Sequence, residues 1–174
     1  MRVFLAIELP DEVCGYLRQL QKNLVYGRFS LVKNFHVTLK FLDEISEAQR
    51  QQIKFKLSDL ASEKFTARLS RIGFFPDDKY IKVVWVGAEP ADKFRTLYSE
   101  VEERLKGMFK KDDFVAHITI ARVKFIDDRD KFLNTLRGLS IEQLEFPVNG
   151  IKLKRSTLSP SGPVYDDLEE FSLQ

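Results

Sequence analysis

The sequence predicts an α+β fold with two lobes around a central cleft. Short, β-prone apolar segments alternate with longer segments whose apolar residues recur at helical spacing. This order of strand, helix, strand, helix and strand occurs twice, which predicts two pseudo-symmetric units with largely antiparallel sheets. At 174 residues the chain has the size of one domain. We therefore predict a single bilobal domain over residues 1–174, with an internal repeat over about residues 1–75 and 80–155.

The landmarks of the two halves keep a nearly constant offset. Pro10 and Pro90 lie 80 residues apart, and His36 and His117 lie 81 residues apart. An internal duplication explains this match, because the same landmarks then occupy equivalent places in two copies of one unit. A coincidental order of elements in an ordinary α+β domain is the alternative.

Each half contains three expected strands and two expected helices. Pro10 followed by Asp11 ends a strand and begins a helix, and this helix should continue to near Gly27. Ser46 and Gln49 have the spacing of a capping box at the start of the next helix. The elements expected in the first half are strands at residues 3–9, 35–41 and 65–75, and helices at residues 11–27 and 46–62.

The second half repeats this pattern. Pro90 precedes a helix with an apolar stripe that ends at Leu105, and Asp128 can cap a short helix that Gly138 stops. The elements expected here are strands at residues 81–88, 114–123 and 146–153, and helices at residues 91–105 and 128–138.

Composition excludes several classes of protein. The chain has 28 basic and 26 acidic residues, so its surface has mixed sign and any contact with nucleic acid should be local. Its one cysteine, Cys14, cannot form an internal disulfide, and we expect it to be a small core residue. No apolar run approaches the roughly 18 residues of a membrane span, and the first residues lack the features of a signal peptide. We expect a cytoplasmic monomer without membrane contact.

Both histidines of the chain lie in the same short motif. The sequence His-Val-Thr-Leu occupies residues 36–39, and His-Ile-Thr-Ile occupies residues 117–120. In a strand, residues i and i+2 project from one face about 7 Å apart, so each histidine shares a face with its threonine. The intervening apolar residues should be buried beneath that face. If the two strands face each other, two imidazoles and two hydroxyls meet in one cleft.

This combination is suited to chemistry on a phosphate group. One neutral imidazole can take a proton from water while a protonated one gives a proton to the departing alkoxide. The threonine hydroxyls can donate hydrogen bonds to the non-bridging oxygens. Two histidines and one cysteine fall short of a zinc site, so we expect no metal or other cofactor; a carboxylate site for magnesium stays open.

The basic residues Lys152, Lys154 and Arg155 lie along one expected strand. A solvated face and a groove for a polynucleotide are equally good interpretations of this stretch.

Residues 33–44 and 116–122, which contain the two motifs, resemble the two signature strands of the 2H phosphoesterases. Within this family the chain is most similar to the RNA 2',3'-cyclic phosphodiesterases, first described as 2'-5' RNA ligases. The resemblance extends from the first strand to the Ser-x-Leu and Gly-Pro-x-Tyr segments near the end. It implies a bilobal α+β fold, a metal-free site in the cleft, and RNA 3' ends or nucleotides with a 2',3'-cyclic phosphate as substrates, hydrolysed to 2'-phosphates.

The resemblance also implies roles for six residues. They are His36 as proton donor to the ribose 3'-oxygen, His117 as proton acceptor from water, Thr38, Thr119 and Arg122 as phosphate contacts, and Phe41 as a surface that stacks on the terminal base. From geometry alone the two histidine roles could be exchanged.

Phe41 and Arg122 both lie five residues after their histidine, where strict alternation would turn them away from the cleft. A cleft role therefore requires a bulge or a strand end between the third and fifth positions of each motif. The chain departs from the family at Asp43, where glycine is frequent, and this leaves the following turn in doubt. Tyr165 could either pack in the core or line the cleft.

Two other functions remain compatible with these motifs. The reverse reaction would join a 2',3'-cyclic end to a 5'-hydroxyl as a 2'-5' linkage. A nucleotide-binding module with little turnover would retain the cleft without using it for catalysis.

Overall fold

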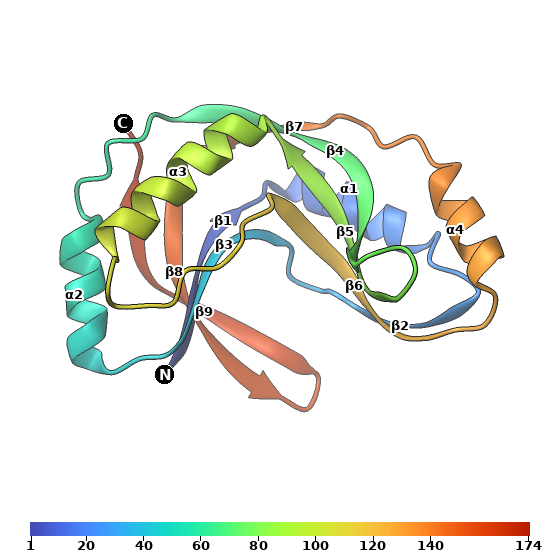
Figure 1. Cartoon of the computed structure of the whole chain (residues 1–174), viewed down its shortest axis with the longest axis horizontal. Coiled ribbons are helices and arrows are strands. Elements are labelled where there is room, and N and C mark those ends of the chain that lie inside the picture. The colour runs from blue at the N-terminus through green and yellow to red at the C-terminus, as the bar shows by residue number, and fades with distance from the viewer.

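The computed structural model describes residues 1–174 and contains two antiparallel sheets that lie side by side (Figure 1). A cleft between them is lined by residues of both sheets. Sheet A has the strand order β3-β1-β8-β9 and sheet B the order β2-β6-β5-β4-β7. The strands are β1 (Arg2–Glu8), β2 (Gly27–Leu31), β3 (His36–Glu44), β4 (Phe65–Pro76), β5 (Ile81–Glu89), β6 (His117–Ile126), β7 (Glu145–Val148), β8 (Gly150–Ser159) and β9 (Gly162–Ser172). The helices are α1 (Asp11–Gln21), α2 (Glu47–Leu57), α3 (Ala91–Arg104) and α4 (Arg129–Arg137).

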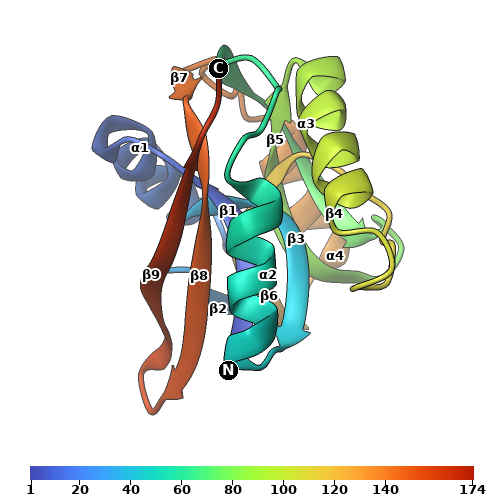
Figure 2. The same cartoon turned by 90° about the vertical axis from the view of Figure 1, so that its left-hand side faces the viewer.

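Helices cover the outer faces of both sheets (Figures 1 and 2). On sheet A, Arg50 of α2 forms an ion pair with Glu169 of β9 at 2.9 Å. On sheet B, Phe132 of α4 stacks on Phe29 of β2 with ring centroids 5.5 Å apart. The inner faces of the sheets are thereby left to form the cleft.

The predicted two-lobed α+β fold with antiparallel sheets is confirmed, and the structure adds an exchange of elements between the lobes. The first half contributes α1 and β4 to the sheet B lobe, where α1 reaches β6 through a hydrogen bond from Gln21 Nε2 to the Ile120 carbonyl at 2.8 Å. The second half contributes α3 and β8 to the sheet A lobe, where Glu102 of α3 pairs with Lys40 of β3 at 2.5 Å. Because of this exchange, neither half of the chain forms a lobe alone.

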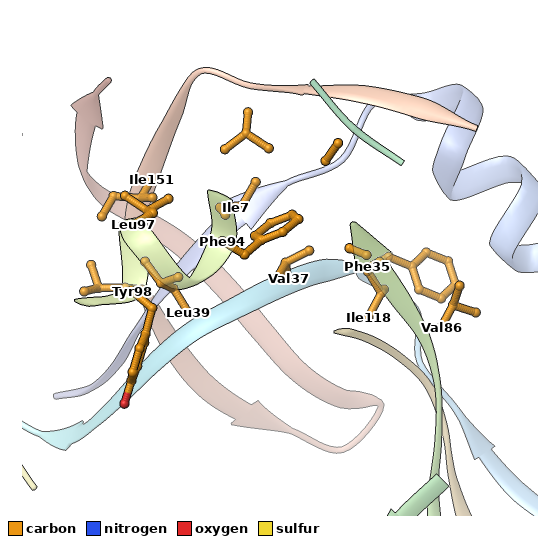
Figure 3. Packing of buried hydrophobic residues seen from close by; sticks show 14 of the residues in the cluster. Ile7, Phe35, Val37, Leu39, Val86, Phe94, Leu97, Tyr98, Ile118 and Ile151 are labelled. Atoms are coloured by element: carbon orange, nitrogen blue, oxygen red, sulfur yellow. The ribbon is translucent and has the colours of Figure 1, made fainter. Parts of the chain in front are cut away.

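The hydrophobic core lies behind the two motif strands. In Figure 3, Val37 and Leu39 of β3 lie beside Phe94 and Leu97 of α3, and Ile118 of β6 lies with Val86 of β5. The apolar motif residues are almost completely buried, with at most 2% of their surface exposed, which confirms their expected place: Val37, Leu39, Ile118 and Ile120. Each such burial contributes about 1.5–3 kcal/mol. These side chains therefore hold the histidine strands firmly against their lobes.

Several element boundaries differ from the sequence prediction. The first helix ends at Gln21 rather than near Gly27, and the second at Leu57 rather than near residue 62. Gly27 instead begins β2, an edge strand of sheet B that was not predicted. The Gln21 side chain explains the early end of α1, because its amide donates to the Val32 and Ile120 carbonyls and ties the helix end to neighbouring chain. Tertiary contacts overrode the helical pattern of residues 22–26.

The C-terminal part also differs from the prediction. The single strand expected at residues 146–153 is two strands, β7 in sheet B and β8 in sheet A, so the chain crosses between sheets at Asn149. A further strand, β9, pairs with β8 along its whole length. The predicted helix starts are confirmed: Ser46 and Gln49 form the capping box, and Asp128 accepts from the Lys131 amide.

Candidate active site

The two histidine motifs meet in one pocket of about 500 Å³ between the sheets. His36 and Thr38 extend into it from β3, and His117 and Thr119 extend into it from β6. Each histidine is the first residue of its strand, so the two occupy equivalent positions in the two lobes. All six residues singled out from the sequence line this pocket: His36, Thr38, Phe41, His117, Thr119 and Arg122.

Phe41 and Arg122 reach the pocket because both strands contain the required bulge. The pairing of β1 with β3 skips Leu39, since Leu5 pairs with Lys40 and Ala6 with Thr38. The pairing of β5 with β6 skips Ile120 in the same way. Each irregularity lies three residues after its histidine and turns the fifth residue back toward the cleft. The predicted bulge is confirmed in both halves.

Asp43 has a φ of 53°, in the left-handed region that favours glycine. It lies next to a second register shift of β3, where Leu42 has no partner on β1. This positive φ explains why glycine is frequent at the position of Asp43 in the family that the sequence resembles. An aspartate is among the residues that tolerate this conformation, so the strand retains its shape.

Aromatic rings enclose His36. Its ring centroid lies 5.0 Å from that of Phe4 and 5.4 Å from that of Tyr165. Burial among these rings, together with the nearby Lys154 ammonium, lowers the pKa of His36 to about 4. His36 is therefore neutral in the empty pocket at neutral pH. Tyr165 lines the cleft, which resolves the alternative left open by the sequence.

His117 has different neighbours. Phe75 lies edge-on to its ring at 4.8 Å, and the Trp85 ring lies at 5.8 Å. The Val115 carbonyl lies 2.6 Å from Nδ1 of His117, so Nδ1 carries a proton and donates it to this carbonyl. In the neutral ring, Nε2 then holds the free lone pair. Burial lowers the pKa of His117 as well.

We expect the free energy of unfolding to fall as the pH is lowered from about 6.5 toward about 4. In this interval the unfolded chain binds a proton on His36 that the folded protein excludes, because the pKa is about 4 when folded and 6.5 when exposed. The stability linked to His36 is complete above the unfolded pKa and is lost as the pH falls through the folded pKa. The loss amounts to at most about 3 kcal/mol.

Urea unfolding of the wild type and of His36→Phe, near pH 7 and near pH 4.5, measures this effect. The variant should lose less stability than the wild type between the two conditions. An equal loss in both proteins would assign the pH dependence to other groups.

Sequence reasoning missed several pocket residues. Phe4 and Phe75 lie beside the histidines, and Arg2 lines the pocket together with Phe41. No local pattern marks these residues, because they reach the motif strands only through the pairing of strands that are distant in sequence.

The structure favours the first of the two interpretations of the basic stretch on β8, a solvated face, over a groove for a polynucleotide. Lys152 and Lys154 both form ion pairs with Glu8 and Asp167 at 2.6–2.9 Å, and Arg155 pairs with Asp166 at 2.8 Å. Sheet order also places β8 between β1 and β9, so it is not an edge strand. The charges of this stretch are neutralised within the protein.

Other sequence expectations concern Cys14, metals and membranes. Cys14 is a half-buried free thiol packed against the core. No group of three or more histidine, cysteine, aspartate or glutamate side chains is placed to hold a metal ion. None of the helices combines the length and the apolar character that crossing a membrane requires.

Solved structures share this fold. A Thermus thermophilus protein of known structure superimposes with a TM-score of 0.75 at 31% identity, over 99% of this chain and 97% of its own. E. coli LigT superimposes with a TM-score of 0.77 at 22% identity, over 99% and 96% of the two chains. At that identity the similarity to LigT concerns the fold. The fold and the paired motifs together define a phosphoesterase of the two-lobed type.

The family model described as LigT like Phosphoesterase matches residues 7–85 and again residues 86–165. The chain belongs to this family, the 2H phosphoesterases. The RNA 2',3'-cyclic phosphodiesterase of Methanocaldococcus jannaschii is 36% identical, over 98% of this chain and 100% of the relative. The protein of the same name from Aquifex aeolicus is 37% identical, over 94% of this chain and 90% of the relative.

Proposed function

We propose that this protein hydrolyses the 2',3'-cyclic phosphate at RNA 3' ends to a 2'-phosphate, without a metal ion. The observation that carries the proposal is the convergence of two histidines and two threonines, from equivalent positions of two lobes, in one pocket. The names of the Methanocaldococcus and Aquifex relatives support the same substrate.

The surroundings of His117 suit a general base. Its Nδ1 proton is held by the Val115 carbonyl, which fixes the tautomer and leaves the Nε2 lone pair available to take a proton from water. The same hydrogen bond stabilises the imidazolium that forms when this proton is taken.

His36 acts as the proton donor to the ribose 3'-oxygen. In the empty pocket its pKa of about 4 leaves it neutral at pH 7. The negative charge of a bound cyclic phosphate favours the protonated ring and raises this pKa, so substrate binding supplies the condition for proton donation. The low pKa in the empty pocket also favours the reverse assignment, in which His36 is the base. A substrate whose leaving group needs no proton distinguishes the two assignments.

The remaining pocket residues bind the substrate. The hydroxyls of Thr38 and Thr119 donate to the non-bridging phosphate oxygens, on which negative charge grows in the transition state. Arg122 has no ion-pair partner within the protein and supplies a guanidinium to the same phosphate. Phe41, with 57% of its surface exposed, offers a ring for stacking with the terminal base.

The direct test is an assay of an RNA oligonucleotide with a 2',3'-cyclic end in the presence of a chelator. We expect a product with a terminal 2'-phosphate, identified by mass spectrometry and by its resistance to nucleases that need a free 2'-hydroxyl. A 3'-phosphate product, or activity that requires an added divalent ion, would contradict the proposal. A second RNA with a 5'-hydroxyl in the same incubation reports ligation, and binding without turnover would indicate a nucleotide-binding module.

A further inference from the structure

A second, smaller pocket of about 180 Å³ lies on sheet B next to His117. Its floor includes Gly87, the residue directly opposite His117 in the pairing of β5 with β6. On the other side of Gly87, β4 has a bulge in which Ser70 and Arg71 together lie opposite Gly87. The bulge follows from the register, since Leu69 pairs with Ala88 and Ile72 pairs with Val86. His117, Gly87 and Arg71 thus form a row across β6, β5 and β4. These three strands are neighbours in sheet B (Figure 1).

The spacing of these three strands gives the distance between the smaller pocket and the catalytic pocket. Neighbouring strands lie about 4.8 Å apart, so the backbone of Arg71 is roughly 10 Å from that of His117. Trp85 fills the space between the pockets: its ring contacts His117 on one side, and the Arg71 guanidinium lies over it at 5.4 Å. The smaller pocket is therefore separated from the catalytic pocket by about the width of one indole.

Two guanidinium groups from different elements line this pocket without a carboxylate partner. Arg71 comes from β4 and Arg95 from the second turn of α3, and neither forms an ion pair within the protein. Glu89 also lines the pocket, but Arg68 holds its carboxylate at 2.9 Å. Two unpaired like charges that share a pocket favour the binding of an anion.

Comparison with the sheet A lobe shows that this pocket is a property of the sheet B lobe alone. In the sheet A lobe, the residue opposite His36 is Glu8, and its carboxylate pairs with Lys152 and Lys154 on the same sheet. In the equivalent place beside His117, the carboxylate is replaced by Gly87, and the cations have no partner. A side chain at Gly87 would collide with Ser70 Oγ, 2.5 Å from an added Cβ, so glycine also keeps the floor of the pocket open.

We propose that the Arg71–Arg95 pocket binds a backbone phosphate of the RNA chain next to the terminal cyclic phosphate. This inference rests on the proposed function and narrows its substrate class to oligonucleotides, with mononucleotides as poorer substrates. The volume fits one phosphate group better than a whole nucleotide, since sites for complete small ligands usually enclose about 300–1,000 Å³. A local site of this kind agrees with the nearly balanced charge of the chain.

The test compares two substrates in the wild type and in the double variant Arg71→Gln/Arg95→Gln. For a hexanucleotide with a 2',3'-cyclic end, kcat/KM should fall about tenfold or more in the variant, the effect of losing charged hydrogen bonds to a phosphate. For a nucleoside 2',3'-cyclic phosphate, kcat/KM should stay within about twofold of the wild type. The salt dependence of the hexanucleotide reaction should become shallower by about 0.7 in log–log slope for one lost phosphate contact.

Two control variants accompany this comparison. Lys93→Gln changes the net charge by one on the exposed surface of the same helix and should leave both substrates unaffected. The single variant Arg95→Gln leaves the contact between Arg71 and Trp85 intact. It should still lower kcat/KM for the hexanucleotide. Thermal unfolding verifies that each variant is folded.

Three results would overturn the inference. In the first, the double variant has the wild-type kcat/KM for the hexanucleotide. In the second, the folded double variant loses kcat/KM equally for both substrates, which would place the arginines in the site of the terminal nucleotide. If the wild type hydrolyses neither substrate, the proposed function fails, and the phosphate pocket is then tested by binding alone. Fluorescence anisotropy measures the affinity for a labelled hexanucleotide that ends in a 2'-phosphate. An affinity about tenfold weaker in the double variant would support the phosphate pocket, and an unchanged affinity, the third result, would overturn it.

Discussion

Replacement of His36 or of His117 by alanine lowers kcat/KM for an RNA end with a 2',3'-cyclic phosphate by about 10²–10⁴-fold, the range for loss of a positioned acid or base. Each imidazole has one task in the proposed reaction, and with only two histidines in the chain no other imidazole can substitute for it. The measurement is steady-state hydrolysis in a chelator, with the melting temperature of each variant as the control for folding. A single variant that retains most of the wild-type rate would remove its histidine from the mechanism.

The double variant should lose little more than the worse of the two single variants. The two rings act on one transition state, and the effects of groups that act as a unit are far from additive. A double loss equal to the product of the single losses would indicate independent roles.

A substrate with sulfur in place of the bridging 3'-oxygen assigns the acid and the base. A thiolate leaves without a proton at neutral pH, because a thiol is far more acidic than an alcohol. The histidine that donates the proton is then dispensable, and we expect His36→Ala to recover activity on this substrate while His117→Ala does not. Recovery by His117→Ala instead would exchange the two roles, in agreement with the low pKa of His36 in the empty pocket.

Replacement of Thr38 or Thr119 by valine should lower kcat by about 10²–10³-fold, with a smaller change in KM, as for loss of one oxyanion-hole donor. Valine retains the β-branched shape that the strand accommodates and removes only the hydroxyl. The loss falls on kcat because the phosphate oxygens gain charge mainly in the transition state.

Thr66→Val is the matched control for these variants. Thr66 is an exposed strand threonine of β4 outside the pocket, so its replacement should leave both kinetic constants unchanged. If the pocket variants raise KM and leave kcat unchanged, the hydroxyls bind the ground state and the proposed stabilisation of the transition state is wrong.

The histidine strands could be predicted from the sequence because their pattern is local. Alternation with period two places His36 and Thr38 on one face and buries Val37, whatever the rest of the chain does. The sequence also predicted that a bulge is required if Phe41 and Arg122 line the cleft. Both side chains can reach it only if the regular alternation of the strand is interrupted before the fifth residue after the histidine. The structure meets this condition at Leu39 and at Ile120.

The C-terminal strands could not be predicted in the same way. The apolar residues of 146–153 are compatible with one continuous strand, yet Phe146 pairs with Ala67 in sheet B and Leu153 pairs with Leu5 in sheet A. Which sheet a strand joins depends on partners more than seventy residues away, and no local pattern encodes that choice. The same applies to the exchange of α1 and α3 between the lobes.

The sequence by itself determined the two-lobed α+β fold, the paired histidine and threonine faces, and the small net charge, from which we expect any contact with nucleic acid to be local. Those features depend on residue types, on spacings within a few positions, and on the nearly constant offset of 80 and 81 residues between the two halves. Only the tertiary structure decided that Phe4 and Tyr165 surround His36 while Phe75 and Trp85 surround His117. It also decided that Lys152 and Lys154 are neutralised beside one histidine while Arg71 and Arg95 stay unpaired beside the other. The reason is physical: burial and charge pairing at a site are set by the side chains that distant strands bring to it, and a repeat of the local motif leaves those neighbours free to differ.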